Sequence, residues 1–155
     1  MRTAIATAQS QSVRLLQCGV SADTADMCYQ FIDECVNNTD KPICNTPKEQ
    51  FDTIRGYGFG NHRIHITPAW SLSALLGLLP KEIDIDGYPY RISIYFENPD
   101  EPVIGNQWCL FYKPKKNAEK SHYIDDVPMY ATDLIECAVL MVEWLTRHNI
   151  KLNEQ

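Results

Sequence analysis

Residues Glu82–Phe96 read EIDIDGYPYRISIYF, and this stretch gives the clearest indication of the fold. Two runs that alternate apolar and polar residues flank the dipeptide Asp86-Gly87. Such a dipeptide favours a type I′ turn, because both central residues of that turn need positive φ. The stretch therefore predicts a β-hairpin. Pro89 has no N–H to donate, which places the start of the second strand at a sheet edge.

The second strand of this hairpin has two different faces, since successive side chains of a strand point in opposite directions. One face is expected to carry Tyr90, Ile92, Ile94 and Phe96. The other face is expected to carry Arg91, Ser93 and Tyr95. Two further strands, QWCLFYKP at residues 107–114 and SHYID at residues 121–125, predict that the hairpin continues as an antiparallel meander.

Helices are expected on both sides of these strands. Upstream, PAWSLSALLGLLP at Pro68–Pro80 offers Ser71 as an N-cap, with Trp70 and Leu75 as a hydrophobic staple. One face of this helix carries Leu72, Leu75, Leu76 and Leu79. A core position is favoured over a partner-binding face, because uncovered leucine patches are rare on soluble monomers.

The chain closes with the strongest helical pattern. Asp133 is expected to be its N-cap, Glu136 to complete a capping box and Asn149 to stop the helix. Its buried stripe is expected to be Leu134, Ala138, Met141, Val142 and Leu145.

This order of elements predicts an α+β protein, with an antiparallel sheet of three to four strands and helices packed on one face. We expect a single domain over residues 1–155. It comprises an N-terminal helical segment at 1–36, an irregular loop with Gly, Pro and Cys residues at 37–66, and an α-β-β-β-α core at 67–155.

In the N-terminal segment, a helix is expected over Thr7–Cys18, with Gly19 in the left-handed conformation after it. A second helical turn, capped by Ser21 or Asp23, is expected to reach about Phe31 and to pack Met27 and Phe31 inward. The inward residues of the first helix are expected to be Val13, Leu15, Leu16 and Cys18.

Composition limits the classes of function. Of the 155 residues, 45% are apolar and 22% are charged, as in ordinary globular domains. The formal net charge of −6 works against non-specific attraction to nucleic acid or anionic lipid. No uncharged run approaches the roughly 20 apolar residues that cross a bilayer, and the N-terminus lacks the apolar segment of a secretory signal. We therefore expect a cytoplasmic protein with no membrane partner.

The cysteines raise the question of a metal site. They are Cys18, Cys28, Cys35, Cys44, Cys109 and Cys137. Zinc ligands usually come in close pairs from one tight turn, whereas Cys28, Cys35 and Cys44 are widely spaced, and His62 and His65 follow only after a further gap. We expect free thiols in a reducing compartment, no metal and no cofactor.

Candidate binding residues lie in the irregular segment, because a long irregular stretch in a compact domain is commonly functional. They are Tyr57, Phe59, His62, Arg63 and His65. The GYGFG run at residues 56–60 lacks the lysine and the strand–helix context of a phosphate-binding loop. No cysteine sits in a catalytic motif, so no catalytic residue is assigned. The one basic cluster comprises Lys113, Lys115, Lys116 and Lys120.

Several blocks of the chain resemble a group of uncharacterised small proteins from gut Bacteroides-type bacteria, their phages and their mobile elements. These blocks are QS..LL..G...DTADM at Gln11–Met27, the PAWSLSALLGLLP run, the Y-x-I-x-I strand from Tyr90 and the final helix with Trp144-Leu145. The resemblance implies no known activity. Its members have a shorter connection between the first two blocks, so the cysteine-bearing segment here is a local elaboration.

The order helix, three strands, helix is also similar to that of double-stranded-RNA-binding domains and, more loosely, of HicB-type antitoxins. Such RNA-binding domains hold phosphate with lysines at the start of the last helix. That place here holds Thr132, Asp133 and Glu136, so this basis for binding double-stranded RNA is missing. A likeness of fold does not transfer function.

The sequence favours a non-enzymatic accessory or adaptor protein that acts by protein–protein contact. No catalytic constellation is present, and tyrosines and tryptophans exceed the needs of a core, which is typical of interfaces. The alternative is an antitoxin-like or nucleic-acid-associated regulator that uses the lysine cluster. A second alternative is a Cys/His hydrolase that uses the segment around His62 and His65. A protein partner is expected, and nucleic acid is not the favoured ligand.

Overall fold

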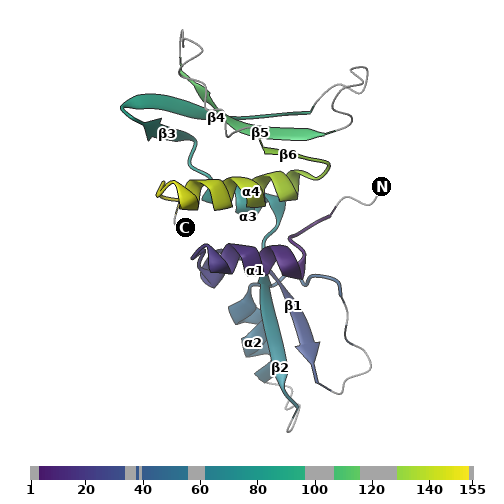
Figure 1. The fold of residues 1–155 in the computed structure, drawn as a ribbon. Helices are drawn as coiled ribbons and strands as arrows, with labels where there is room; N and C mark the ends of the chain where they lie inside the picture. The colour runs from purple at the N-terminus through teal and green to yellow at the C-terminus, as the bar shows by residue number, and fades with distance from the viewer. Residues whose placement is uncertain are drawn as a thin grey trace. The chain divides into compact units, whose positions relative to one another are not determined.

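The computed structural model describes residues 4–33, 38, 40–55, 62–96, 107–115 and 129–153. The chain divides into two compact units, one reaching to Leu75 and the other beginning at Leu76. Each unit contains helices and an antiparallel sheet, so the expected α+β class is confirmed (Figure 1). The strands form two sheets, however, where the sequence predicted one.

The first unit is built on a two-stranded sheet. Its elements are α1 (Gln9–Gln17), a 3₁₀ helix η1 (Ala22–Thr24), β1 (Met27–Ile32), α2 (Pro47–Arg55) and β2 (Ile64–Ala69). Strands β1 and β2 pair from Met27 opposite Ala69 to Ile32 opposite Ile64. The helix α2 contacts both strands, and Gln50 on α2 donates a hydrogen bond to Gln30 on β1.

The expected helical turn up to Phe31 is wrong. Ser21 does act as a cap, accepting a hydrogen bond from the N–H of Asp23, but the helix that follows is the single 3₁₀ turn η1. The chain then extends as β1, where Met27 is buried while the side chain of Phe31 is 51% exposed. The run MCYQFI is rich in residues that suit strands, and its pairing with β2 decides its conformation.

Residues 37–66 are more regular than expected, because α2 lies within them. Thr46 and Glu49 form a reciprocal capping box, in which each side chain accepts the backbone N–H of the other residue at 3.2 and 3.1 Å. Pro47 stands at the first helical position, where its missing N–H has no cost. The GYGFG run lies outside the described residues.

The helix α1 ends as expected, since Gly19 has a φ of 85°. Its inward face is only partly as expected. Leu15 and Ser12 are buried, whereas Val13 and Leu16 are exposed. Ser12 belongs inside because its hydroxyl lies 2.9 Å from that of the buried Thr7.

Thr7 is the centre of a buried polar network in the first unit. Its hydroxyl accepts the backbone N–H of Trp70 at 3.1 Å, and its carbonyl accepts the hydroxyl of Tyr29 at 2.9 Å. The indole N–H of Trp70 donates to the hydroxyl of Thr24 at 2.9 Å. These bonds join the start of the chain to the end of β2, so they fix the N-terminal segment against the sheet.

The PAWSLSALLGLLP run forms the helix α3 (Leu72–Leu78), with Ser71 as its N-cap. The Ser71 hydroxyl accepts the N–H of Ala74 at 3.2 Å, and Asp26 accepts both the N–H and the hydroxyl of Ser71. Trp70 and Leu75 are fully buried, in agreement with a core position. Leu78 and Leu79 are buried as well, whereas Leu72 and Leu76 are only partly covered.

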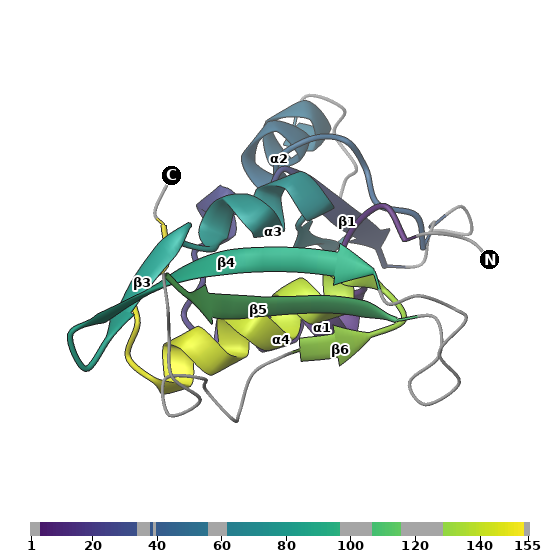
Figure 2. The ribbon, with the colours of Figure 1, turned by 90° about the horizontal axis from the view of Figure 1, so that it is seen from above.

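The second unit is built on a four-stranded antiparallel meander. Its strands are β3 (Glu82–Ile85), β4 (Tyr88–Phe96), β5 (Trp108–Pro114) and β6 (Met129–Ala131), in that spatial order. The helix α4 (Leu134–Arg147) contacts β5 and β6 and lies against one face of the sheet (Figures 1 and 2). The expected strand SHYID lies outside the described residues.

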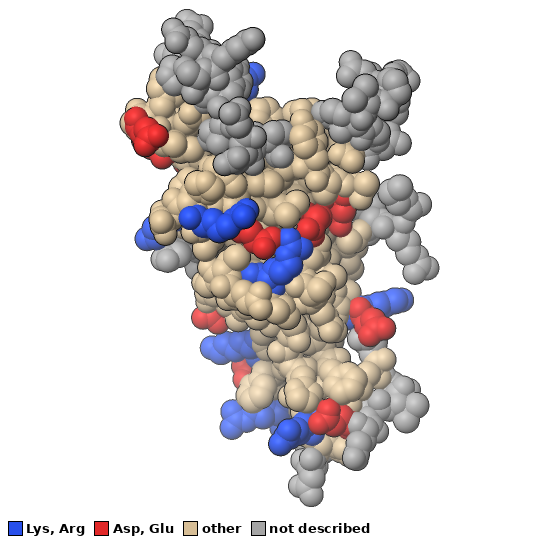
Figure 3. Space-filling view, in the orientation of Figure 1, with Lys and Arg blue, Asp and Glu red and all other residues tan. Residues whose placement is uncertain are grey.

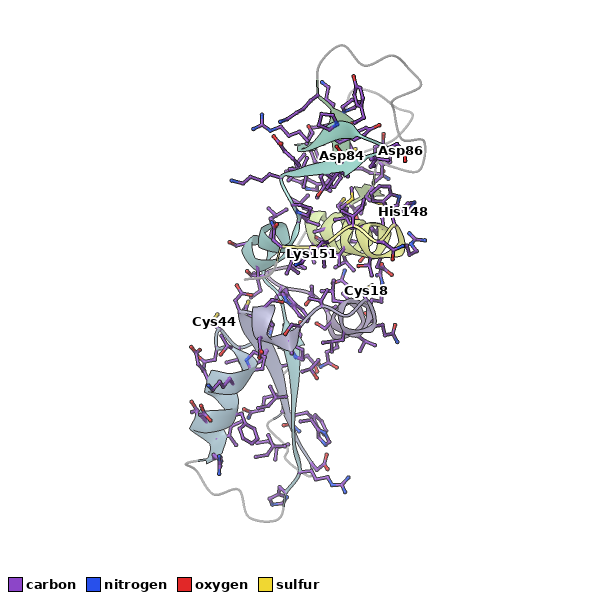
Figure 4. All side chains as sticks on the ribbon, turned by 90° about the vertical axis from the view of Figure 1, so that its left-hand side faces the viewer. Cys18, Cys44, Asp84, Asp86, His148 and Lys151 are labelled. Atoms are coloured by element: carbon purple, nitrogen blue, oxygen red, sulfur yellow. The ribbon has the colours of Figure 1, made fainter. Side chains whose placement is uncertain are left out.

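The hairpin that the sequence predicted is present. Asp86 and Gly87 have φ values of 54° and 81°, as a type I′ turn requires. The carboxylate of Asp84 accepts the N–H of Gly87 at 2.8 Å, and Asp84 and Asp86 both lie at this turn (Figure 4). The acidic side chains here thus stabilise the turn.

The face of the sheet toward α4 carries the core of this unit. By register it includes the buried residues Ile83, Tyr90, Leu110 and Tyr112. As expected, Asp133 caps α4 by accepting the N–H of Ile135 at 3.0 Å, and Asn149 ends it with a φ of 56°. Asn153 then caps α3, because its side chain donates to the carbonyls of Gly77 and Leu79.

Candidate functional site

The expected site around His65 lies at the end of the two-stranded sheet. His65 on β2 faces Phe31 on β1, with ring centroids 6.1 Å apart. The imidazole Nε2 lies 3.3 Å from a carboxylate oxygen of Asp33, and the backbone carbonyl of Arg63 accepts the N–H of Asp33. His62 precedes the strand. Tyr57 and Phe59 lie outside the described residues.

This His65 cluster has the character of a contact surface. Phe31 is 51% exposed, and the side chains of His65 and Asp33 are exposed by 54% and 41%. A histidine held by a carboxylate needs a nucleophile or a bound water in contact to act as a catalytic base. Among the described residues, the side chain of His65 contacts those of Phe31 and Asp33.

A second candidate surface is the outer face of the four-stranded sheet, opposite the face toward α4. By register it includes Arg91, Ser93, Tyr95, Cys109, Phe111, Lys113 and Tyr130. Tyr95, Cys109 and Tyr130 lie side by side on three strands. Hydrogen bonding with Cys109, followed by burial, raises the pKa of Tyr95.

The other end of the outer face is basic. Arg91 pairs across the strands with Lys113, and Lys115 forms an ion pair with Glu82. Lys115 holds the pKa of Glu82 below its usual range. A cavity of about 220 Å³ lies here, lined by Arg91, Ile92, Ser93, Lys113, Pro114 and Lys115. Its charged side chains suit an anionic group.

Among the described residues of the second unit, those at the end of β4 form its most exposed apolar part. Ile94, Tyr95 and Phe96 are exposed by 38%, 41% and 46% although they lie in a regular strand. On one side β4 pairs with β5 over its whole end. On the other side the pairing with β3 ends at Arg91, and the N–H of Ile92 donates to Lys81. No described strand pairs with β4 beyond that point.

The thiols divide by exposure. Cys28, Cys109 and Cys137 are buried, Cys18 is partly covered and Cys44 is exposed. Cys44 lies before α2 and Cys18 at the end of α1, at separate places (Figure 4). Burial raises the pKa of Cys28, and it raises that of Cys137 to about 11. Cys35 lies outside the described residues, and the described part of the chain contains no cluster of three metal-ligating side chains.

These environments predict the order of thiol modification. Iodoacetamide at pH 7.5 is expected to alkylate Cys44 at least about 100-fold faster than Cys137, because the thiolate is the reactive form and each pKa unit lowers its fraction about tenfold. Peptide mapping by mass spectrometry over a time course measures both rates. Denaturation in urea is the control and should bring the rates together. Equal rates in the native protein would contradict the burial of Cys137.

Comparison with known proteins gives no relative: no protein-family model, no curated protein and no solved structure matches this chain. Within the described residues, no helix is long and apolar enough to span a bilayer.

Sequence reasoning found part of these surfaces. It identified His65 and placed Arg91, Ser93 and Tyr95 on one face of a strand, which the register bears out. It did not find Phe31 and Asp33 as neighbours of His65, because β1 was taken for a helical turn. Lys113 lies at the end of β5 and Lys115 directly after it, and both line the cavity beside Arg91. Lys116 and Lys120 lie outside the described residues.

Proposed function

We propose that this protein is a non-enzymatic accessory or adaptor protein that binds another protein through the end of β4. One observation carries the proposal: Ile94 and Phe96 on one face of β4, and Tyr95 on the other, are exposed at a strand edge that no described strand covers. Exposed apolar patches on monomers mark interaction sites, and open strand edges are otherwise avoided. The His65 cluster offers a further contact in the first unit.

The buried thiols and two tyrosine hydroxyls of the described residues support a role in contact. The buried thiols of Cys28 and Cys137 have raised pKa values and are poor nucleophiles. The pKa values of Tyr95 and Tyr112 are likewise raised, by hydrogen bonding with Cys109 for Tyr95 and by burial for Tyr112, so neither hydroxyl is activated. These groups therefore suit packing and contact better than acid–base work.

Copurification from the native host tests the proposal. Phe96→Ala is expected to weaken capture of the partner about tenfold, because buried aromatic anchors contribute more than 1 kcal/mol to an interface. The matched control is Phe51→Ala, which removes an equally exposed ring (53% against 46%) from α2. Loss of the partner in both variants, or in neither, would contradict a role for β4. Unchanged melting temperatures show that both variants fold.

A second candidate function is an antitoxin-like or nucleic-acid-associated regulator. The observation in its favour is the outer face itself, where Phe111 and Tyr95 pack edge to face at 5.6 Å near Arg91 and Lys113. Aromatic and basic side chains together suit single-stranded nucleic acid.

Charge weighs against that second candidate. Lys115 is already paired with Glu82, and the formal net charge is −6. Acidic and basic side chains are also mixed over the face seen in Figure 3. Binding of a labelled single-stranded oligonucleotide over a salt series measures the alternative, because phosphate contacts give a steep salt dependence.

A further inference from the structure

We infer that Asp86-Gly87, in the turn between β3 and β4, is a site of spontaneous modification at which Asp86 rearranges to isoaspartate, and that the Asp84 carboxylate slows this reaction. The inference concerns the chemistry of the chain itself and is independent of the proposed function. It rests on the exposed geometry of the turn and on one hydrogen bond to the nitrogen that reacts.

The dipeptide has the features that this rearrangement needs. Asp86-Gly87 is the one place in the sequence where an aspartate or an asparagine precedes a glycine. Glycine leaves its own nitrogen accessible, because it has no Cβ to crowd that atom. Both residues are exposed, and a Cβ at Gly87 would meet no atom within 4 Å apart from those of its chain neighbours. The turn therefore has room for a ring to close and access to the water that opens it.

The reaction needs only the chain and water. The nitrogen of Gly87 attacks Cγ of the protonated Asp86 carboxyl group, so that the N–Cγ bond forms and a carboxyl oxygen leaves as water with the amide proton. Water then adds to one of the two carbonyls of the succinimide ring. Opening at the side-chain carbonyl restores aspartate, whereas opening at the main-chain carbonyl gives isoaspartate. Nothing is oxidised or reduced.

The Asp84 carboxylate acts on the attacking atom. Its Oδ1 accepts the N–H of Gly87 at 2.8 Å, and Figure 4 shows Asp84 and Asp86 at the same turn. The nitrogen has to lose this proton as it attacks, and a neighbouring negative charge opposes such a loss. The hydrogen bond also directs the N–H at Asp84, whereas the attack requires the nitrogen to approach Cγ of Asp86. The same contact that stabilises the turn thus protects it.

The modification would act on the edge of the sheet. The turn joins Ile85 to its partner Tyr88, with positive φ at both central residues. Isoaspartate inserts one methylene into the backbone of this turn, whose two-residue geometry is matched to the twist of the flanking strands. The pairing of Ile85 with Tyr88 is therefore expected to be lost in the isoaspartate form, so that β3 separates from β4 at the turn.

Ageing of the full-length protein at neutral pH tests the inference. Trypsin cleaves after Lys81 and Arg91, so it releases the turn in the peptide Glu82–Arg91. The isoaspartate form keeps the mass of this peptide, separates from it by chromatography and is located at Asp86 by electron-transfer fragmentation. In Asp84→Ala the rate of isoaspartate formation is expected to rise about tenfold, because a hydrogen bond to a charged group is lost.

Two variants separate the hydrogen bond from general loosening of the hairpin. Glu82→Ala removes an acidic side chain from the same strand, together with its ion pair to Lys115, but keeps the acceptor of the Gly87 N–H. Its rate is expected to stay close to that of the unchanged protein. Asp84→Asn keeps an oxygen acceptor without the charge, so its rate should lie between those of the unchanged protein and Asp84→Ala.

The released peptide shows whether the fold is required. When the peptide Glu82–Arg91 is aged after its release, Asp84→Ala should change the rate little, because an isolated hairpin of this size holds no stable turn. Water enriched in heavy oxygen gives a further signature, since opening of the ring inserts one oxygen from the water at Asp86.

Hydrogen exchange measures the structural consequence. The amides of Ile83 and Ile85 point at β4, by the same alternation that directs the Ile92 N–H to Lys81. Both amides are expected to exchange faster in the isoaspartate form than in the unmodified protein.

The inference is overturned if folded Asp84→Ala forms isoaspartate no faster than the unchanged protein, or if Glu82→Ala is accelerated as much. It is also overturned if Asp84→Ala accelerates the reaction equally in the released peptide, or if the product contains no heavy oxygen.

Discussion

Replacing Leu75 with alanine is expected to lower the free energy of unfolding by about 2 to 5 kcal/mol. Leu75 is fully buried in α3, in the run that the sequence identified as a core helix. Truncation removes apolar surface from the core and leaves a cavity that neighbouring side chains fill only in part. Denaturant unfolding followed by tryptophan fluorescence measures the loss.

Leu76→Ala is the matched control for this prediction. It makes the same chemical change one position later in the same helix, where the side chain is only partly covered. This variant is expected to lose less than about 1.5 kcal/mol of the free energy of unfolding, because folding buries less of the apolar area of this side chain. Similar losses in the two variants would mean that α3 presents a different face to the core.

Thr7→Val is expected to lower the free energy of unfolding by about 2 to 4 kcal/mol, because it removes a buried oxygen with almost no change in volume. The backbone N–H of Trp70 and the hydroxyl of Ser12 both lie within hydrogen-bond distance of this oxygen. Each would lose a partner inside the protein, at a cost of about 1 to 3 kcal/mol. Thermal and urea unfolding measure the effect.

Thr7→Ser separates the hydrogen bonds from the packing. The serine keeps the oxygen and loses only the methyl group, so a loss of about 1 kcal/mol is expected. If Thr7→Val were no more destabilising than Thr7→Ser, the hydrogen bonds of the Thr7 hydroxyl would contribute no more than one buried methyl group, and the importance given to the network would be wrong.

Local signals in the sequence determined the elements whose cause lies within a few residues. Asp86 and Gly87 set the hairpin turn because their backbones accept positive φ. Asp133 begins α4 and Asn149 ends it for reasons equally local. The capping box of Thr46 and Glu49 was present as well and predicts α2, although the turn-rich residues around it led us to expect a loop.

Other features were decided only by tertiary structure. The run that forms β1 has no strong alternation, and it becomes a strand because β2, far along the chain, pairs with it from Met27 to Ile32. The same pairing brings Phe31 beside His65 and so makes the exposed cluster at the end of the first unit. The preference of single residues for a helix or a strand is weak, and pairing with a distant strand overrides it.

The candidate surfaces show the same division. The alternation in RISIYF determined by itself that Arg91, Ser93 and Tyr95 share a face. It contained no information on where β3 ends, on which side of β4 remains open, or on the approach of Lys113 and Lys115 to Arg91. Periodicity is a property of one strand, whereas an edge and a cavity exist only between strands, so their positions depend on contacts between residues that are distant in sequence.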